Sequence, residues 1–600
     1  NAGVAELTFP YGEFRPGQRD MAVSVYRAFT SSQQLVLQAP TGIGKTMASI
    51  FPAVRAFTEG RLEKIFYLTA KSSGQEMARA AVSDLRAKQL PLRDVTLTAR
   101  DKICFNPGAP CDPEHCEYAR GYYDKMPGIL NDALLQSQAL TREAIESLAR
   151  EHTVCPFELG LDLAVIADVV ICDYNYVFDP AVYLRRFFET ADDRHGLLID
   201  EAHNLVDRGR DMFSASLQKS MFLDLRREIR TEWPLLGKQL AAVNREILAL
   251  ARAPQLPVDA DEERSAVKPA DSSGNGNRGR LQERVQDSLP DKLLNALRRL
   301  CEAFDLAFQS ADHAVRHEGM LRCWFDCLRF LRVSEYFDEH YRCLITPGAA
   351  GVEGQASRSR AGDCRVQLCN INPGPLLAKA FERAGPSVCF SATMAPQHYY
   401  RTLLGVRDTA PWYGIGSPFD PDHLGVFITT FISTTYRNRN ASLYDLVDLI
   451  HTIVSAQQGN YLVFAPSYAY LNEVAGKFRE RYGHISVLQQ TPGLTEEEQQ
   501  AFTAAFREDA TETLVGFAVM GGLFGEGIDL KGRRLIGVVI IGVGMPQPAA
   551  ERELIREYFD QRDDQGSGFD FAYVLPGMNR VLQTAGRVIR GDDDRGIVCL

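Results

Sequence analysis

Short apolar runs alternate with amphipathic stretches along this chain, and the alternation predicts its fold. The runs are rich in Val, Ile, Leu and Phe, as buried parallel strands are, and the stretches between them have the apolar spacing of helices. Parallel strands joined by crossover helices form an α/β fold. The runs fall into two sets, at 35–38, 65–69, 169–172, 197–199 and 388–391, and then at 461–465, 514–518, 535–541 and 572–575. Two sets predict two parallel sheets and therefore two α/β domains.

Two stretches of different character interrupt the first set of runs. Residues 100–165 contain four cysteines, and residues 206–365 contain long helical patterns at 220–252 and 281–332. Within the second stretch, residues 254–280 are rich in Pro, Asp, Ser, Gly and Asn, a composition typical of a loop. We therefore expect a small cysteine-bearing region and a larger helical region.

The net charge limits the classes of partner. The 600 residues include 66 Lys and Arg against 77 Asp and Glu, which gives a net charge of −11. A protein that coats nucleic acid with its whole surface is usually basic, so this charge argues against that class. Taken alone, it favours an ATPase that does not act on nucleic acid, although a motor needs only a local basic groove.

Cysteine usage and hydropathy indicate the compartment. The 13 cysteines are an odd number in a long chain without a visible signal peptide, which favours a reducing compartment and thiols or metal ligands over disulfides. No apolar run reaches the length of about 18 residues that a membrane span needs. We expect no membrane partner and a location in the bacterial cytoplasm or nucleoid. The abrupt start and end lead us to expect a piece of a longer protein.

A phosphate-binding loop is the strongest local signal. It follows the apolar run 35–38, precedes a helical stretch, and reads APTGIGKT. Glycines let the backbone wrap phosphates, and the free amides at a helix start bind negative charge. Lys45 is expected to reach the β- and γ-phosphates, and the Thr46 hydroxyl to bind Mg²⁺. The alternative is a turn that carries Gly-Lys-Thr by chance. The predicted ATP contacts are Ala39, Pro40, Thr41, Gly42, Ile43, Gly44, Lys45 and Thr46.

An acidic box ends the apolar run 197–199 and reads Asp-Glu-Ala-His. Asp200 is expected to hold Mg²⁺, and Glu201 to polarise the attacking water and accept its proton. His203 is expected to link the nucleotide state to the second domain. The alternative is a helix start with capping acids, which is common on its own.

A group of basic and amide residues near the end of the chain suits the far side of an ATP cleft. Gln583, Arg587 and Arg590 are spaced i, i+4 and i+7, so the pattern predicts that they share one helix face. Arginines delivered to the γ-phosphate stabilise transition-state charge. The alternative is a surface helix with two arginines.

Two further segments are candidates for coupling. The glycine-rich stretch 521–530 contains Glu526 and Asp529. We expect these two residues to couple the nucleotide state to the groove that holds a nucleic-acid strand. Its alternative interpretation is a flexible loop. Ser391 and Thr393 follow an apolar run and can relay between the acidic box and a substrate groove, although hydroxyl residues at strand ends are also frequent turn residues.

The order of these segments resembles that of superfamily 2 helicases, and within them the XPD/DinG family. The segments are APTGIGKT at 39–46, YLTAKSSGQ at 67–75, DEAH at 200–203, FSATM at 390–394, YLVFAPSY at 461–468, GEGIDL at 525–530 and QTAGRVIR at 583–590. The resemblance implies two RecA-like motor domains, with an iron–sulfur insertion and a helical arch in the first. The expected boundaries are 1–99, 166–205 and 366–404 for motor domain 1, 100–165 for the cluster domain, 206–365 for the arch, and 405–600 for motor domain 2.

The same resemblance implies the activity. It indicates an ATP hydrolase that moves 5′ to 3′ on single-stranded DNA and acts on forked or tailed duplexes, as a monomer, in DNA repair or replication-linked processing. Repair or replication proteins are candidate partners. By position, Gln18 resembles the residue that reads adenine, since an amide can pair with the adenine edge as donor and acceptor. Its alternative role is that of a polar residue at a helix start. Lys71, Ser72, Ser467, Tyr468 and the segment 174–176 lie where such helicases approach DNA, and strand-end packing is the alternative for the two tyrosines of 174–176.

Four cysteines are candidate metal ligands. Cys104, Cys111, Cys116 and Cys155 have the spacing C-x6-C-x4-C-x38-C. Four thiolates hold either a [4Fe–4S] cluster or Zn²⁺, and spacing alone leaves both open, together with unconnected buried cysteines. The family resemblance implies the [4Fe–4S] cluster.

Two rival functions remain at this level. A DEAH-type RNA helicase shares the acidic box, and an ATPase that remodels nucleoproteins through protein partners suits the acidic charge and the region 206–365.

Overall fold

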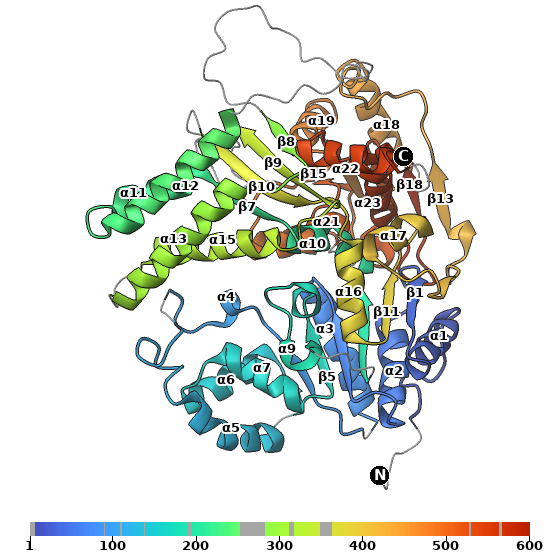
Figure 1. Ribbon diagram of the computed structural model, residues 1–600. Helices are drawn as coiled ribbons and strands as arrows, with labels where there is room; N and C mark the ends of the chain where they lie inside the picture. The colour runs from blue at the N-terminus through green and yellow to red at the C-terminus, as the bar shows by residue number, and fades with distance from the viewer. Residues whose placement is uncertain are drawn as a thin grey trace, which may run out of the picture.

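The computed structural model of the protein describes residues 7–88, 90–108, 111–136, 138–189, 194–252, 283–310, 317–347, 363–526, 530–562 and 567–600. Two parallel sheets with helices on both faces make up most of it, and an arm of long helices projects beside them (Figure 1). The predicted α/β architecture with two RecA-like sheets is confirmed. Within the described residues, no helix is long and apolar enough to cross a membrane.

The first sheet is parallel throughout and has eight strands. Alternate residues of its central strands enter two different cores, which is why these strands read as continuous apolar runs. Leu35 and Leu37 pack with the helices of one face, whereas Val36 packs with those of the other. In spatial order the strands are β12 (Trp412–Gly414), β1 (Gln34–Gln38), β11 (Ser387–Ser391), β6 (His195–Asp200), β2 (Lys64–Leu68), β5 (Val169–Cys172), β3 (Asp94–Thr96) and β4 (Ala139–Leu140).

Helices cover both faces of this sheet. One face carries α1 (Gln18–Thr30), α2 (Lys45–Thr58) and α3 (Ser72–Arg86). The core of the other face includes residues of shorter helices and of one longer helix. These are α8 (Asn175–Phe178), α9 (Arg185–Phe188), α10 (Leu205–Met212), α16 (Gly374–Ala384) and α17 (Gln397–Leu404), with the 3-10 turn η1 (Ala202–Asn204) before α10.

The second sheet has six parallel strands. Their spatial order is β13 (Leu424–Phe427), β18 (Gly596–Cys599), β17 (Gly537–Ile540), β14 (Asn460–Ala465), β16 (Leu514–Val519) and β15 (Ser486–Gln489). The remaining elements of this half are η2 (Pro421–His423), α18 (Leu443–Ala456), α19 (Tyr468–Arg481), α20 (Glu496–Ala504), α21 (Leu523–Glu526), η3 (Gly532–Arg534), α22 (Ala550–Asp560), η4 (Asp570–Val574) and α23 (Leu575–Ala585).

The run 572–575, expected to be a strand, is helical. It spans the end of η4 and the start of α23. Ala572 and Tyr573 are buried, whereas Val574 and Leu575 are only partly buried. A short buried run has the same composition in a helix as in a strand, so the sequence pattern could not separate the two.

The larger insertion combines long helices with a sheet that the sequence did not predict. Four antiparallel strands lie at its base, in the order β7 (Ala215–Gln218), β10 (Cys364–Asn370), β9 (Tyr341–Pro347) and β8 (Arg284–Gln286). Buried and partly exposed residues alternate along β7 and the first part of β10, so neither forms an apolar run. The helices are α11 (Lys219–Ile229), α12 (Pro234–Arg252), α13 (Asp291–Ser310) and α15 (Glu318–Ser334), so the pattern 220–252 is two helices that meet before Pro234.

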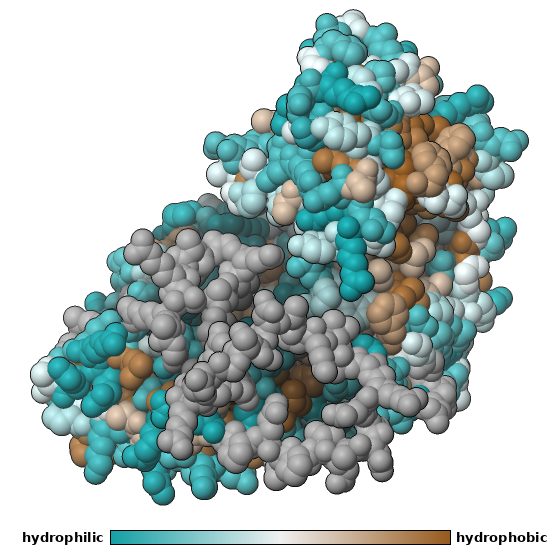
Figure 2. All heavy atoms as spheres, turned by 90° about the horizontal axis from the view of Figure 1, so that it is seen from above, coloured by the Kyte–Doolittle hydropathy of each residue, from teal (hydrophilic) through white to brown (hydrophobic). Residues whose placement is uncertain are grey.

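The cysteine-bearing insertion is a small helical unit. It contains α4 (Arg100–Ile103), α5 (Tyr122–Gln136), α6 (Arg142–His152) and α7 (Pro156–Ile166), and it lies below the arm in Figure 1. Seen from above, most of the coloured molecular surface is hydrophilic, with hydrophobic residues gathered in patches (Figure 2).

Candidate active site

The phosphate loop joins the carboxyl end of β1 to the first turn of α2. Gly42 and Gly44 adopt φ values of +83° and +80°, a region that L side chains rarely occupy. A Cβ atom on Gly44 would also lie 2.5 Å from Gln18 Nε2, so the loop needs glycine there for space as well. The loop therefore presents its amides at the start of α2, as a phosphate site requires.

Two side chains hold this loop in place: that of Arg15, which precedes α1, and that of Gln18, the first residue of α1. Arg15 Nη1 donates to the carbonyl of Gly42 at 2.7 Å, and Gln18 Nε2 donates to the carbonyl of Gly44 at 3.3 Å. Gln18 Oε1 accepts from the backbone N–H of Arg15, and the Gln18 side chain is buried. Gln18, predicted to contact adenine, thus contacts the phosphate loop itself. The role of Arg15 was not foreseen, because nothing local distinguishes it from a surface arginine.

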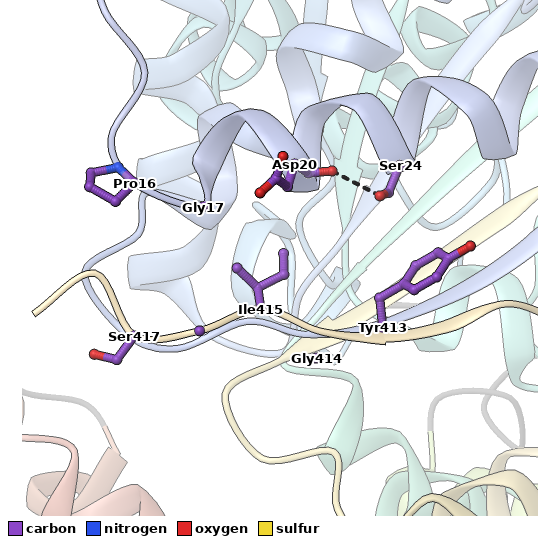
Figure 3. A pocket seen from close by; sticks show the side chains of 9 residues that line it. Pro16, Gly17, Asp20, Ser24, Tyr413, Gly414, Ile415 and Ser417 are labelled. Carbon is purple, nitrogen blue, oxygen red and sulfur yellow. Dashed lines mark hydrogen bonds between the residues drawn. The ribbon is translucent and has the colours of Figure 1, made fainter.

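A hollow of about 480 Å³ lies beside the start of α1. Its lining residues are Pro16, Gly17, Asp20, Ser24 and the segment 413–417 (Figure 3). Asp20 and Ser24 lie on α1, where the Ser24 hydroxyl donates to the Asp20 carbonyl, and Tyr413 and Ile415 approach from the opposite wall. Ile415 packs against Gly17 and its backbone N–H donates to Gln38, so this wall continues the edge of the sheet next to the phosphate loop.

The acidic box stands at the carboxyl end of β6, and buried tyrosines hold it. The Tyr67 hydroxyl donates to Asp200 Oδ2 at 2.8 Å, and the backbone N–H of Glu201 donates to Asp200 Oδ1 at 2.9 Å. The Tyr174 hydroxyl donates to the backbone carbonyls of Asp200 and Glu201. The expectation that Tyr174 approaches DNA is wrong, because its side chain is fully buried in this role, as the packing alternative predicted.

Charges set different protonation for the two carboxylates. Burial and then the Glu201 charge raise the pKa of Asp200 from 3.8 to about 6. Burial also acts to raise the pKa of Glu201, but Lys45 and His203 outweigh it and hold that pKa well below 4.5. Lys45 Nζ lies 3.7 Å from Glu201 Oε1. Glu201 is therefore ionised near neutral pH, and Asp200, with its pKa of about 6, takes up a proton as the pH falls through that value.

A chain of hydrogen bonds links the acidic box to the second domain. The Ser391 hydroxyl donates to Glu201 Oε2 at 2.9 Å, and His203 Nδ1 lies 2.7 Å from the same hydroxyl. Since Ser391 has one proton, His203 Nδ1 is the donor in that contact. Gln583 Nε2 faces His203 Nε2 at 3.4 Å and donates to Thr393 Oγ1 at 2.7 Å. The relay thus runs from Gln583 through His203 and Ser391 to Glu201.

The second domain also touches the phosphate loop directly. Thr41 Oγ1 donates to the carbonyl of Gly586 at 3.4 Å, and the Phe419 ring packs on Gly42. Arg587, next to Gly586 in sequence, is buried and donates through Nε to the carbonyl of Gly525 at 3.1 Å.

The predicted helix face of Gln583, Arg587 and Arg590 is wrong. The helix α23 ends at Ala585, and Gly586 follows it, so only Gln583 is helical. The backbone N–H of Arg590 donates to Asp594 at 2.8 Å in the turn beyond. A glycine after a helical pattern is a frequent stop, and this signal was available in the sequence.

Of the two coupling residues predicted in the second domain, the structure describes Glu526 but not Asp529. Glu526 is the last residue of α21, close in sequence to the Gly525 carbonyl that Arg587 contacts. Asp529 lies outside the described residues.

Family comparisons agree with this geometry. The DEAD_2 family matches residues 74–222, and the Helicase C-terminal domain family matches residues 450–600. The chain is similar to the ATP-dependent DNA helicase YoaA of Escherichia coli, with 23% identity over 98% of this chain and 91% of that protein. It is also similar to the XPD/RAD3 helicase subunit of the general transcription and DNA repair factor IIH of Saccharomyces cerevisiae, with 20% identity over 99% of this chain and 86% of the relative.

Solved structures share the fold. A structure titled XPD helicase superposes with a TM-score of 0.62 at 17% identity, over 98% of this chain and 95% of its own. Xpd4 of S. tokodaii superposes with a TM-score of 0.56 at 15% identity, over 97% and 94%. This chain belongs to the XPD/DinG family of superfamily 2 helicases. The helicase therefore has its two sheets as motor domains, with the phosphate loop and the acidic box on motor domain 1.

The four candidate ligand cysteines of the helicase lie in the small helical unit. Cys104 follows α4, Cys155 precedes α7, and Cys111 and Cys116 lie on the segment between α4 and α5. Arg100 Nη1 lies 3.7 Å from the Cys111 sulfur. Burial is the main cause that raises the pKa of the Cys155 thiol, and the Cys111 charge adds to it.

Candidate DNA contacts of the helicase lie where strands end. Lys71 and Ser72 follow β2 at the start of α3, and Ser467 and Tyr468 follow β14 at the start of α19. Ser467 caps its helix by accepting from the backbone N–H of Tyr470 at 3.3 Å. The Tyr468 hydroxyl accepts from Gln490 Nε2 at 3.0 Å. These contacts give Ser467 and Tyr468 structural roles at a position that was predicted to contact single-stranded DNA.

Proposed function

We propose that this chain is an ATP-dependent DNA helicase that moves 5′ to 3′ along single-stranded DNA. The relatives that it matches are named ATP-dependent DNA helicases or helicase subunits of a DNA repair factor. We assign it to DNA repair or replication-linked processing in the cytoplasm or nucleoid, as a monomer that acts on forked or tailed duplexes. Repair or replication proteins are its proposed partners.

The observation that carries this proposal is the relay across the cleft. Gln583 of motor domain 2 reaches His203, and His203 reaches Glu201 through Ser391. A change in the position of motor domain 2 therefore changes the hydrogen bonding of the proposed general base. Because hydrolysis and domain position are coupled at this point, each ATP cycle can alternate two states with different grips on the strand.

The proposed chemistry follows from the residue positions. The loop amides and Lys45 bind the phosphates, and Thr46 and Asp200 would hold Mg²⁺, which would neutralise phosphate charge when bound. Glu201 orients the attacking water and takes its proton; it is ionised because its pKa is lowered, and its contact with Ser391 orients it. Arg587 and Arg590 face the γ-phosphate from motor domain 2 in this proposal, and Glu526 and Asp529 couple the nucleotide to DNA.

We propose that Cys104, Cys111, Cys116 and Cys155 hold a [4Fe–4S] cluster. Thiolates alone suit iron–sulfur clusters and zinc. A zinc tetrahedron with Zn–S bonds of about 2.3 Å draws its sulfurs to within roughly 4 Å of one another. The relatives of this chain include helicases of the XPD type, and the family resemblance is what favours the iron–sulfur cluster. The cluster would tie the ends of the insertion together and shape a path for the strand.

Two measurements test the cluster. The anaerobically purified protein should show a broad absorption band and contain four iron and four sulfide per chain, and Cys111→Ser should lose both. Cys301→Ser, in the arm, is the matched control and should keep both. A colourless protein with stoichiometric zinc would contradict the assignment.

Strand-specific assays test the function itself. We expect single-stranded DNA to stimulate ATP hydrolysis, and we expect unwinding of duplexes with a 5′ tail but not of duplexes with a 3′ tail. Matched RNA substrates should give neither. Preference for RNA would support the DEAH-type RNA helicase, and ATP hydrolysis without any response to nucleic acid would support the remodelling ATPase.

A further inference from the structure

The backbone of the acidic box is strained at Glu201. Glu201 adopts φ +47° and ψ +47°, the left-handed region that residues with a side chain rarely occupy. Among the described residues, Ser32 and Thr153 are the other non-glycine residues with positive φ, and both lie just past the carboxyl end of a helix, where this conformation is frequent. Glu201 follows a strand instead, so no helix end explains its conformation. Such a residue persists only where its surroundings hold it.

The left-handed conformation directs the Glu201 side chain to its partners. Glu201 Oε1 lies 3.7 Å from Lys45 Nζ, and Oε2 accepts from the Ser391 hydroxyl at 2.9 Å. A return to the right-handed helical region would change φ by roughly 110° and turn the Cα–Cβ bond away from its present direction. The carboxylate would then leave Lys45 and Ser391 together. The strained backbone is therefore what holds the proposed general base in place.

A buried tyrosine restrains this backbone. The Tyr174 hydroxyl lies 2.5 Å from the carbonyl oxygen of Asp200 and 3.1 Å from that of Glu201, and the two carbonyls share its single proton. These carbonyls belong to the peptide units before and after the Glu201 Cα atom, so a donor that contacts both restrains φ and ψ between them. Burial, and then the charges of Asp200 and Glu201, raise the pKa of Tyr174 well above 10, so the hydroxyl keeps the proton that it donates.

The turn that carries Tyr174 is itself tied to the acidic box. Arg208 Nη2 donates to Asp173 Oδ1 at 2.9 Å and to Asn175 Oδ1 at 3.0 Å, on either side of Tyr174 in the sequence. Arg208 lies on α10, which follows the acidic box. The contacts thus form a closed path from the box along the chain to Arg208, across to the turn, and back through the Tyr174 hydroxyl.

The same turn is anchored in the core. The backbone N–H groups of Val177 and Phe178 each donate to the Tyr174 carbonyl at 3.0 Å. The Phe178 ring is buried against Phe381 of α16, with ring centroids 5.0 Å apart. Because none of these contacts involves the Tyr174 hydroxyl, a phenylalanine at this position removes one hydrogen-bonding group and leaves the anchor of the turn in place.

We infer that Tyr174 is a positioning residue for ATP hydrolysis, which keeps Glu201 in its left-handed conformation so that the carboxylate meets the attacking water. The inference rests on the proposed role of Glu201 as general base and adds the group that orients it. Tyr174 acts through Glu201, whereas the phosphate loop binds the nucleotide. Loss of the hydroxyl should therefore lower kcat and leave the KM for ATP unchanged.

ATP turnover of the whole protein, measured without DNA, tests the inference. We expect Tyr174→Phe to lower kcat roughly tenfold, since a strained conformation lies about that far above its relaxed form. Tyr461→Phe is the matched control, because Tyr461 is also a buried tyrosine whose hydroxyl donates to a backbone carbonyl, that of Gln457 at 2.6 Å. Both variants should lose some thermal stability, but only Tyr174→Phe should lose kcat. An equal loss of kcat in both variants would overturn the inference.

A double-mutant cycle shows whether Tyr174 acts through Glu201. Glu201→Gln removes the proposed base, so the residual turnover no longer depends on where that carboxylate points. Tyr174→Phe should therefore lower kcat no further in the Glu201→Gln background. If the two losses multiply instead, Tyr174 supports motor domain 1 in general, and the inference is overturned.

Arg208 supplies a second variant in the same path. Arg208→Gln releases the turn but keeps the hydroxyl, so we expect a smaller loss of kcat, roughly threefold, at unchanged KM. Arg227→Gln is its control, since Arg227 is an exposed arginine of α11 that pairs with Asp224 at 2.9 Å. If Tyr174→Phe does not fold, Arg208→Gln decides alone. A loss of kcat that disappears in the Glu201→Gln background supports the inference, and an unchanged kcat overturns it.

Two outcomes separate this inference from its foundation. A wild-type protein without ATP turnover, or a Glu201→Gln variant with normal turnover, would remove the proposed chemistry itself. A wild-type protein with turnover that depends on Glu201, whose Tyr174→Phe variant keeps its kcat or changes only its KM, would leave that chemistry standing and overturn the role of Tyr174.

Discussion

On the motor domain 1 side of the cleft, the acidic residues are held by neighbours on the strands of one sheet or just beyond the strand ends, whereas the motor domain 2 side presents its groups from the ends of helices. Asp200 accepts from Tyr67 and from a backbone amide, and Tyr174 anchors the backbone of the box. Across the cleft, Arg587 follows the last turn of α23 and donates to the carbonyl of Gly525 in α21. The first side is organised for chemistry before closure, and the second depends on closure.

This difference suggests a division of labour. Groups on the sheet of motor domain 1 should determine whether ATP is hydrolysed at all. Groups on motor domain 2 should determine whether hydrolysis responds to DNA. Substitutions on the two sides are therefore expected to differ in kind as well as in size.

The largest effect is expected for the phosphate-loop lysine. Lys45→Ala removes the cation that faces both the phosphates and Glu201, so we expect ATP turnover to fall by roughly 10²–10³-fold. Lys88→Ala, at an exposed position, is the control and should turn over normally. Steady-state phosphate release with and without single-stranded DNA measures both. Normal turnover in Lys45→Ala would mean that the site is placed wrongly.

A smaller effect of a different kind is expected for the relay from motor domain 2. Gln583→Ala removes neutral hydrogen bonds to Thr393 and His203, so we expect a loss of about 1 kcal/mol, or roughly fivefold. The loss should appear in DNA-stimulated turnover, with the basal rate changed little. The ratio of stimulated to basal rates measures the effect. If both rates fall equally, the two sides of the cleft do not divide their roles as proposed.

The sequence predicted the contiguous motifs of motor domain 1 better than the contacts between distant parts of the chain. The phosphate loop and the acidic box were predictable because strand, loop and functional residues are contiguous, and strands buried on both faces form unbroken apolar runs. Arg15 and Tyr67 contact those segments from distant parts of the chain, so no local pattern indicates them. The end of α23 differs from the prediction because Gly586 ends the helix, although the spacing of Gln583, Arg587 and Arg590 fits a helix face.

Short strands with half-exposed residues also could not be predicted from the sequence. The strands β7 and β8 of the arm alternate buried and exposed positions over only a few residues, and their pairing joins segments far apart in the chain. The helical pattern around them was visible, but their antiparallel sheet was not.

The Mg²⁺ requirement of ATP turnover should depend on pH through Asp200 of motor domain 1. The pKa of Asp200 is raised to about 6, and Mg²⁺ binding needs its ionised form. As pH falls through about 6, protons compete with the cation, so the half-saturating Mg²⁺ concentration should rise several-fold between pH 7.5 and 5.5. ATP turnover titrated with Mg²⁺ at each pH measures it, after correction for the Mg²⁺ affinity of ATP. An unchanged half-saturation over this range would contradict the role of Asp200.

The smallest expected effect tests the brace rather than the catalytic group. Tyr67→Phe removes a hydrogen bond that lowers the pKa of Asp200, so this pKa should rise further, and more Mg²⁺ should be needed near pH 6. A charge-assisted hydrogen bond has a net value of about 1.5–3 kcal/mol, but the cation replaces part of it, so we expect roughly a threefold change. At pH 8 Asp200 is ionised in both proteins, and the difference should nearly vanish. Gln583→Ala leaves Asp200 untouched and should show no such pH-dependent shift. If Tyr67→Phe raised the half-saturating Mg²⁺ concentration equally at pH 6 and pH 8, Tyr67 would act by packing. The acidic box of motor domain 1 would then be held by side-chain packing rather than by hydrogen bonds to its charged groups.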